Sequence, residues 1–240
     1  MTRSVLSILA LAVAAGCAGP ATEPTPAEPS TEASDLEALY WARQQEAQTR
    51  FTDADVRFMT GMIGHHAQAL VMSAMAPRNG ASPSIRTLAA RIANAQRDEI
   101  ETMQRWLRDR DQPVPEVHIE GTRLMIHMTG GESDGGMNHG GMDHGQMDHG
   151  MGHDHTSMPG MLTQARLDEL DAARGAAFDR LFLTYMIQHH AGAVVMVEDL
   201  FEVDGAGQDE AAFKLASDVQ VDQRTEIARM EQMLAALSDS

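Results

Sequence analysis

The sequence contains a single cysteine, Cys17, and a single lysine, Lys214, in 240 residues. One cysteine excludes both an internal disulfide framework and a zinc site built from several cysteines. The scarcity of lysine belongs to an acidic balance, with a formal net charge of -17. Because nucleic-acid binding needs clustered positive charge, we expect no nucleic-acid partner. An acidic surface instead attracts cations.

Aromatic residues are also scarce, with six Phe, two Tyr and two Trp. Histidine and methionine, by contrast, are abundant, at 11 and 18 residues. A helical core needs neither excess, so packing alone does not account for this composition. The surplus indicates a function that uses imidazole and thioether groups.

No hydrophobic run near the N-terminus is long enough to span a bilayer as a stable helix. Arg3 is followed by a short apolar stretch at residues 5–15, and Cys17 comes directly after Ala-Ala-Gly. This pattern resembles a bacterial lipoprotein signal, in which residues 1–16 are removed and Cys17 becomes the lipid-modified N-terminus. The alternative is an ordinary signal peptide cut at a neighbouring alanine. Both place the protein outside the cytoplasm, in the periplasm or cell envelope. With Ala18 after a lipidated Cys17, we expect the outer membrane where the cell has one.

Proline, glycine and helix-capping residues divide the rest of the chain into segments. The proline-rich residues 17–34 predict an extended tether. Periodicity and caps predict helices at residues 34–50, 52–76, 83–112, 162–173, 175–203 and 208–237. We assign them to a first helical hairpin with a short leading helix (35–112), a linker (113–162) and a second helical hairpin (163–240). Residues 35–240 together are expected to form one domain.

The two hairpins are copies of each other. The pattern Asp-x-x-Phe-x-x-x-Met-Ile-x-His-His-Ala-x-Ala begins at Asp55 and again at Asp179, and Gln-x-x-Glu-Ile follows at Gln96 and again at Gln223. Such a repeat indicates a duplicated structural unit. Neither amphipathic hairpin buries its apolar face alone, so the sequence predicts an all-α four-helix bundle made from the two copies.

Each copy carries a His-His pair in the middle of a methionine-rich helix face. The candidate ligands are Met62, His65, His66, Met72, Glu99 and Met103 in the first copy, and Met186, His189, His190, Met196, Glu226 and Met230 in the second. Imidazole with thioether favours soft ions such as Cu(I) or Ag(I), and imidazole with carboxylate also suits Cu(II). Adjacent residues of a helix point about 100° apart. This leaves open whether both members of a pair face the metal, or whether only one does while the other orients it or opens to solvent.

Each candidate also has a simpler structural interpretation. A buried methionine often serves as a filler of the core, and Glu99 or Glu226 could be a solvated or helix-paired carboxylate. Asp55 and Asp179 lie near helix starts, where interaction with the helix dipole is the favoured interpretation. The occurrence of the His-His pair in both copies is what favours a metal site.

Residues 130–160 form a low-complexity segment that cannot supply a core, and we expect a disordered loop here. The segment repeats Met-x-His with a five-residue period and then adds two more histidines. Its candidate ligands are Met137, His139, Met142, His144, Met147, His149, His153 and His155. These side chains have no core to join, which favours metal capture over an inert linker. Labile chelates of this kind suit scavenging or handing on an ion.

The motif that begins at Asp55 and at Asp179, with its downstream Gln-x-x-Glu-Ile, resembles the domain of unknown function 305 family, which includes the CopM-type periplasmic copper-binding proteins. The resemblance covers about residues 52–107 and 175–237. It implies a ferritin-like helical bundle, export, and copper binding linked to copper tolerance. It also implies ligand roles for the two His-His pairs and for Met62, Met72, Met186 and Met196.

The favoured function is therefore a binding protein, not an enzyme, that sequesters or hands on copper outside the cytoplasm. Its expected partners are metal ions and a membrane, to which a lipid on Cys17 anchors it. Two further partners are left open: a copper exporter or chaperone, and a second copy of the chain. One alternative is a ferritin-like oxidase, although di-iron bundles use Glu-x-x-His and no histidine of the sequence has an acidic residue three positions before it. Another is an envelope scaffold whose His and Met only pack.

Overall fold

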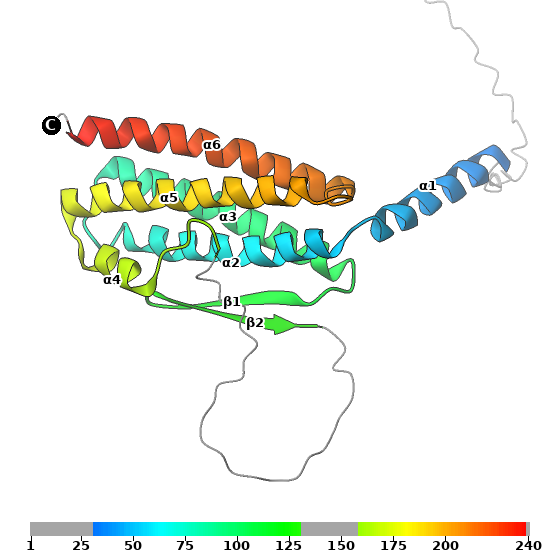
Figure 1. Ribbon diagram of the computed structural model, residues 1–240, viewed down its shortest axis with the longest axis horizontal. Helices are drawn as coiled ribbons and strands as arrows, with labels where there is room; N and C mark the ends of the chain where they lie inside the picture. The colour runs from blue at the N-terminus through cyan, green and yellow to red at the C-terminus, as the bar shows by residue number, and fades with distance from the viewer. Residues whose placement is uncertain (1–30, 131–157, 239–240) are drawn as a thin grey trace, which may run out of the picture. The chain divides into compact units, whose positions relative to one another are not determined.

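The computed structural model describes residues 31–130 and 158–238 (Figure 1). Its elements are α1 (Thr31–Thr49), α2 (Asp53–Met75), α3 (Pro83–Arg108), β1 (Val114–Glu120), β2 (Arg123–Thr129), α4 (Gln164–Ala172), α5 (Gly175–Glu202) and α6 (Glu210–Ser238). The prediction of a mostly helical chain is confirmed, and each helix lies within a few residues of its predicted position. The signal peptide, Cys17, most of the tether and the Met-x-His repeat lie outside the described residues.

The chain divides into two compact units within α1, one that ends at Trp41 and one that begins at Ala42. Leu36, Tyr40 and Trp41 are all more than half exposed on this helix. Among the described helices, none combines the length and the hydropathy needed to cross a membrane.

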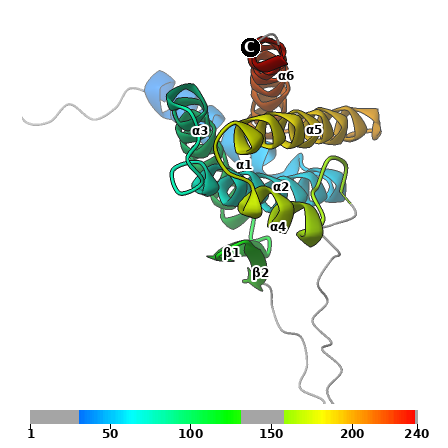
Figure 2. The same ribbon diagram turned by 90° about the vertical axis from the view of Figure 1, so that its left-hand side faces the viewer.

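Helices α2 and α3 form one hairpin, and α5 and α6 form the other (Figure 2). Local sequence sets the helix starts. The Thr52 hydroxyl accepts from the Asp55 amide, and the Asp55 carboxylate accepts from the Thr52 amide at 2.8 Å, so α2 begins with a capping box. Ser82 caps α3 ahead of Pro83, which has a suitable fixed φ and no amide hydrogen to leave unpaired. Helices α2 and α5 pack against each other at the centre.

The first residues of the two motifs tie the hairpins together. Asp55 Oδ1 accepts a hydrogen bond from the Gly207 amide, in the turn before α6, at 2.8 Å. In the same way the Asp179 carboxylate accepts from the Ser82 amide, in the turn before α3, at 3.2 Å. Both aspartates are buried, and each holds the turn of the opposite hairpin. This role is more specific than the helix-dipole interaction favoured by the sequence, and it shows that α2 and α5 are antiparallel.

The apolar core consists of two clusters. The first core cluster contains Phe178, Phe182, Ile85, Leu88 and Met72, where α2 ends and α5 begins. The second core cluster lies toward the other end and contains Phe58, Ile63, Met103, Trp106 and Leu107. The His-His pairs of α2 and α5 belong to neither cluster. Along α2 and along α5, the histidines lie between the residues of the first core cluster and those of the second. They therefore form a polar layer in the middle of the core.

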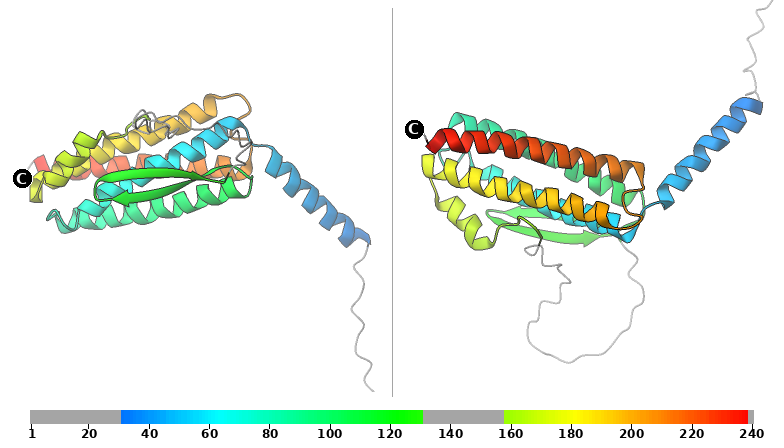
Figure 3. Two further views of the ribbon diagram at one scale, coloured as in Figure 1. Left: turned by 90° about the horizontal axis from the view of Figure 1, so that it is seen from below. Right: turned by 45° about the horizontal axis from the view of Figure 1, so that its top comes forward.

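Strands β1 and β2 form an antiparallel ribbon within the range that we predicted as linker. The ribbon lies along α2 and α3 (Figure 3). Val117 and Leu124 pack against the second core cluster, and Gly121 adopts a φ of 61° at the turn, which glycine accepts without strain. Apolar and polar residues alternate at positions 117–120, ahead of Gly121, and such alternation is a strand signal. The prediction of a linker at 113–162 did not use it.

Helix α4 packs against α5 and α2 and contributes Leu167 and Leu170 to the first core cluster. Asn79, in the turn between α2 and α3, donates to the backbone oxygens of Leu170 and Asp171 at 3.2 and 3.1 Å. Its own backbone oxygen accepts from the Gly175 amide at 3.0 Å. The turn of the first hairpin thus fixes the start of the second.

Candidate metal centre

Four buried histidines occupy the middle of the core. His65, His66, His189 and His190 all have no exposed surface. The rings of His65 and His189 meet across the interface of α2 and α5, with centroids 3.8 Å apart and planes 36° from parallel. The rings within each sequential pair are farther apart, at 6.3 Å. Duplication of one motif therefore produces a central pair from two different helices, flanked by a second histidine on each side.

Burial keeps the central pair neutral. Desolvation, then the nearby His66 ring, lower the pKa of His65 to about 3, although a hydrogen bond to the Pro159 backbone opposes the shift. Desolvation also lowers the pKa of His189 well below its ordinary value, with His65 and His190 adding to the effect. Charged imidazole is disfavoured because burial removes the hydration that would stabilise its charge. Neutral imidazole is the form whose nitrogen lone pair binds metal ions.

Several imidazole nitrogens have no hydrogen-bond partner within the part of the chain that the structure describes. They are Nδ1 of His65, His66 and His190 and both ring nitrogens of His189. A buried polar atom without a partner is rare in proteins and calls for an explanation. Buried imidazole nitrogens without a partner fit an ion as the missing partner.

The outer histidine of each pair contacts a glutamate of the neighbouring helix. His66 Nε2 lies 2.6 Å from Glu99 Oε2 of α3, and His190 Nε2 lies 2.7 Å from Glu226 Oε2 of α6. The Glu side chains are 15% and 23% exposed. Of the roles left open for these glutamates, the structure therefore favours an interaction with the His pairs over free solvation. Each carboxylate fixes the orientation of an imidazole or shares an ion with it.

Asp222 of α6 joins this carboxylate group and was missed by the sequence analysis. Partial burial, then the charges of Glu99, Glu226 and Asp218, raise the pKa of Asp222. Glu99 and Asp222 both line a surface groove between α3 and α6. The repeat gives no signal for this residue, because the corresponding position of the first copy is Ala95. The groove supplies an acidic approach to Glu99, the partner of His66.

The predicted thioethers divide between the two core clusters. Met72, Met186 and Met230 belong to the first core cluster. Met62 and Met103 belong to the second, and Met196 packs against it. Each side of the histidine layer thus holds three of the six predicted methionines. Core filling accounts for their burial as well as a ligand role does, so the ligand role stays a prediction.

Residues 158–162, which we call the seated segment, lie over the central pair. The Pro159 oxygen is 3.1 Å from His65 Nε2, and Gln68 exchanges two hydrogen bonds with the Leu162 backbone, at 2.9 and 2.7 Å. The seat depends on Gly192 of α5, where a Cβ atom would come within 2.6 Å of the Gly160 Cα. Gln68 and Gly192 occupy the same position in the two copies of the motif, and there the copies differ. Both residues contact the seated segment, Gln68 through hydrogen bonds and Gly192 by leaving room for its backbone.

Thioethers also meet beside this seat. A Cβ atom on Gly61 would lie 3.3 Å from both the Met158 sulfur and the Met196 methyl carbon. Met158 was not among the predicted ligands. Among the described residues, no group of three or more His, Cys, Asp or Glu side chains is arranged to hold a metal ion. A site in this layer therefore needs thioether donors or a rearrangement of the His–Glu pairs. The repeat ligands from Met137 to His155 lie outside the described residues.

These features define a helical protein with a layer of buried histidines between methionine-containing clusters. The model of the family described as Domain of unknown function (DUF305) matches residues 55–234. The chain belongs to this family. No curated protein matches the chain.

Solved structures of the same family resemble this one. A DUF305 fragment from Deinococcus radiodurans is 27% identical with a TM-score of 0.56, covering 78% of this chain and 98% of that one. A DUF305 protein from Streptomyces coelicolor is 25% identical with a TM-score of 0.56, covering 77% and 94%. CopM in its Cu(II)-bound form is 27% identical with a TM-score of 0.51, covering 76% and 96%.

Proposed function

We propose that this chain is an exported copper-binding protein that sequesters or hands on Cu(I) or Cu(II) in the cell envelope and contributes to copper tolerance. The observation that carries the proposal is the layer of four buried histidines, with unpartnered nitrogens, between two methionine-containing clusters. Imidazole and thioether together select copper over Mg²⁺ or Ca²⁺, which need oxygen ligands. Ag(I) shares this preference.

The hydrogen bonds of the layer support a specific donor set. If the proton is on Nε2, His65 donates to the Pro159 oxygen. In the same tautomer His66 donates to Glu99, and His190 donates to Glu226. Each Nδ1 then keeps its lone pair for an ion. In this arrangement the glutamates orient the imidazoles and the flanking methionines complete a Cu(I) site. For Cu(II), the His–Glu pairs themselves supply nitrogen and oxygen.

The comparisons support the same metal and compartment. CopM, a relative at 27% identity, has a Cu(II)-bound structure, and the Streptomyces coelicolor relative is described as secreted. The predicted signal at residues 1–16 with lipidation of Cys17 adds a membrane anchor to the proposal. We also propose that the two hairpins form a ferritin-like four-helix bundle. A copper exporter or chaperone would receive the ion, and the chain would form a homodimer.

We propose binding rather than turnover, because the four imidazoles are fully buried and the sequence lacks the Glu-x-x-His pairs of di-iron oxidases. Metal-dependent oxidation of a substrate by the purified protein would favour the oxidase alternative. Retention of no copper at all would leave a scaffold whose His and Met only pack.

The test is a Cu(I) titration against a chromophoric chelator, in a chain whose Met and His residues within 131–157 are replaced by Ser. In this background we expect His66→Asn/His190→Asn to lose the tight Cu(I) equivalents of the core. Met62→Leu/Met186→Leu, which preserves side-chain size, should weaken them without unfolding the protein. The matched control is Ser84→Ala, a polar change at an exposed position in the first turn of α3. Tight binding that survives both double substitutions would contradict the proposal.

A further inference from the structure

We propose that the outer face of the β1–β2 ribbon is a second copper site, formed by Glu116, His118, Met125 and His127. None of these residues belongs to the duplicated motif or to the Met-x-His repeat. The inference extends the proposed function to a surface site. It depends on that function for the identity of the metal but on different residues.

The strand register places the four side chains on one face. Glu116 pairs with His127, and His118 pairs with Met125. Directly opposed residues of an antiparallel ribbon project to the same side, and so do residues two apart along a strand. The two pairs are therefore consecutive on one face. All four residues are exposed, whereas Val117 and Ile126, which pair on the opposite face, are partly covered.

The spacing suits a shared ion. Opposed Cβ atoms of such a ribbon lie about 5 Å apart and diagonal ones about 7–8 Å apart, within reach of long side chains. The four residues form a quadrilateral on the ribbon, in which His118 and His127 are diagonal neighbours and Met125 and Glu116 occupy the other two positions. The strand backbones fix these four positions, so assembling the site requires only rotation of exposed side chains. As they now stand, Glu116, His118 and His127 do not form a metal-ligating group.

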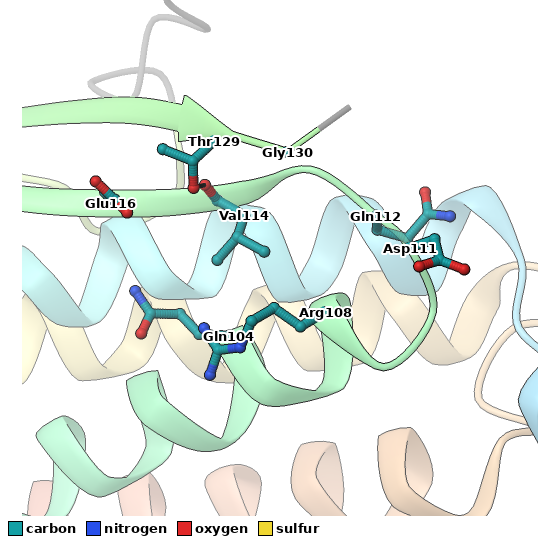
Figure 4. A pocket seen from close by; sticks show the side chains of 8 residues that line it. All are labelled: Gln104, Arg108, Asp111, Gln112, Val114, Glu116, Thr129 and Gly130. Atoms are coloured by element: carbon teal, nitrogen blue, oxygen red, sulfur yellow. Dashed lines mark hydrogen bonds between the residues drawn. The ribbon is translucent and has the colours of Figure 1, made fainter. Parts of the chain in front are cut away.

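The surroundings leave these donors available. Their backbones belong to the strand ladder, but among the described residues none of the four side chains forms a hydrogen bond or an ion pair. Glu116 lies at the edge of a pocket between α3 and the ribbon, which Gln104 and Arg108 also line (Figure 4). Glu120 and Arg123 are opposed in the strand register at the turn end of the same face and carry opposite charges. The Glu116 carboxylate is the negative group opposite His127.

The donor chemistry selects the ion and the kind of site. Two imidazoles with a thioether suit Cu(I), and two imidazoles with a carboxylate suit Cu(II). An exposed site whose ligands keep their rotational freedom exchanges its ion quickly. Strand β2 also ends at Thr129, shortly before the first Met-x-His unit at Met137. The ribbon is therefore an exposed, rapidly exchanging copper-binding site, distinct from the buried histidine layer.

The test uses the full mature chain and two readouts. The first is protection of individual histidines from diethyl pyrocarbonate by one to several equivalents of Cu(I), located by mass spectrometry. We expect copper to reduce modification of His118 and His127 at least fivefold, and Met125→Leu to weaken that protection. The second is the copper stoichiometry of His118→Asn/His127→Asn, which should fall by one equivalent. Both substitutions lie on an exposed surface, and circular dichroism confirms the fold of the variant.

The matched control is Glu120→Gln/Arg123→Gln, on the same face, which should retain the full stoichiometry. Unprotected His118 and His127, or an unchanged stoichiometry in the double His variant, would overturn this inference while leaving the buried site intact. Loss of copper from the His66→Asn/His190→Asn variant with continued protection of His118 shows that the two sites are separate. A wild-type chain that binds no copper would remove both proposals together.

Discussion

Substituting Gly192 with alanine should release the seated segment from the histidine layer. The added Cβ would come within 2.6 Å of the Gly160 Cα, and other backbone atoms of Pro159 are closer still. Backbone atoms of a packed segment cannot yield as the end of a flexible side chain does. We therefore expect residues 158–162 to lose their contacts with α2 and α5 and not merely to shift in place.

The cost follows from the contacts that would be lost. Three hydrogen bonds hold the segment, one at His65 and two at Gln68, and each contributes about 1 kcal/mol. Leu162, which is 1% exposed, would lose about 2 kcal/mol of burial. Alanine in a helix regains about 1 kcal/mol relative to glycine. The free energy of unfolding should thus fall by about 4 kcal/mol.

Urea denaturation gives the free energy of unfolding, and hydrogen exchange at the Leu162 amide reports release of the segment directly. The control is Ala191→Gly, at the exposed neighbouring position, which changes helix propensity alone and should cost about 1 kcal/mol. If Gly192→Ala were as stable as the wild type and kept a protected Leu162 amide, the proposed seat would be wrong.

Three further predictions concern the turn, the central pair and the carboxylates. Asp179→Asn should lower the free energy of unfolding by about 1–2 kcal/mol in denaturant titrations, because the hydrogen bonds from Ser82 lose their charged acceptor; no change would contradict that role. The pKa of His65 is lowered to about 3, so the unfolded chain takes up this proton first and stability falls as pH decreases below about 6.5, by about 1.4 kcal/mol per pH unit. Between pH 6 and 5 the slope should be smaller in His65→Gln, and an equal slope would show that His65 titrates normally. Glu99→Gln should weaken Cu(I) binding at the layer about tenfold in chelator competition, and unchanged affinity would mean that this carboxylate does not act on the ion.

Much of the fold follows from short-range sequence signals. Thr52, Ser82 and Pro83 define helix starts through groups a few residues away, so the helix bounds could be predicted closely. The repeated motif identified the duplication, the family and the central position of the His-His pairs. It did so because helical periodicity places residues three or four apart on the same face, whatever the rest of the chain does.

Only the tertiary structure decided which of these residues meet. In the fold, the His65 ring contacts the His189 ring and not that of its neighbour His66. Asp55 and Asp179 each accept hydrogen bonds from the turn of the opposite hairpin. Asp222 lies close enough to Glu99 for the charges to interact. These contacts join residues far apart in the chain, and their partners depend on how the two hairpins cross. Periodicity assigns a side chain to a helix face, but the packing of the hairpins determines what that face contacts. For this reason the sequence predicted the types of the candidate ligands, whereas the arrangement of the buried histidine layer required the fold.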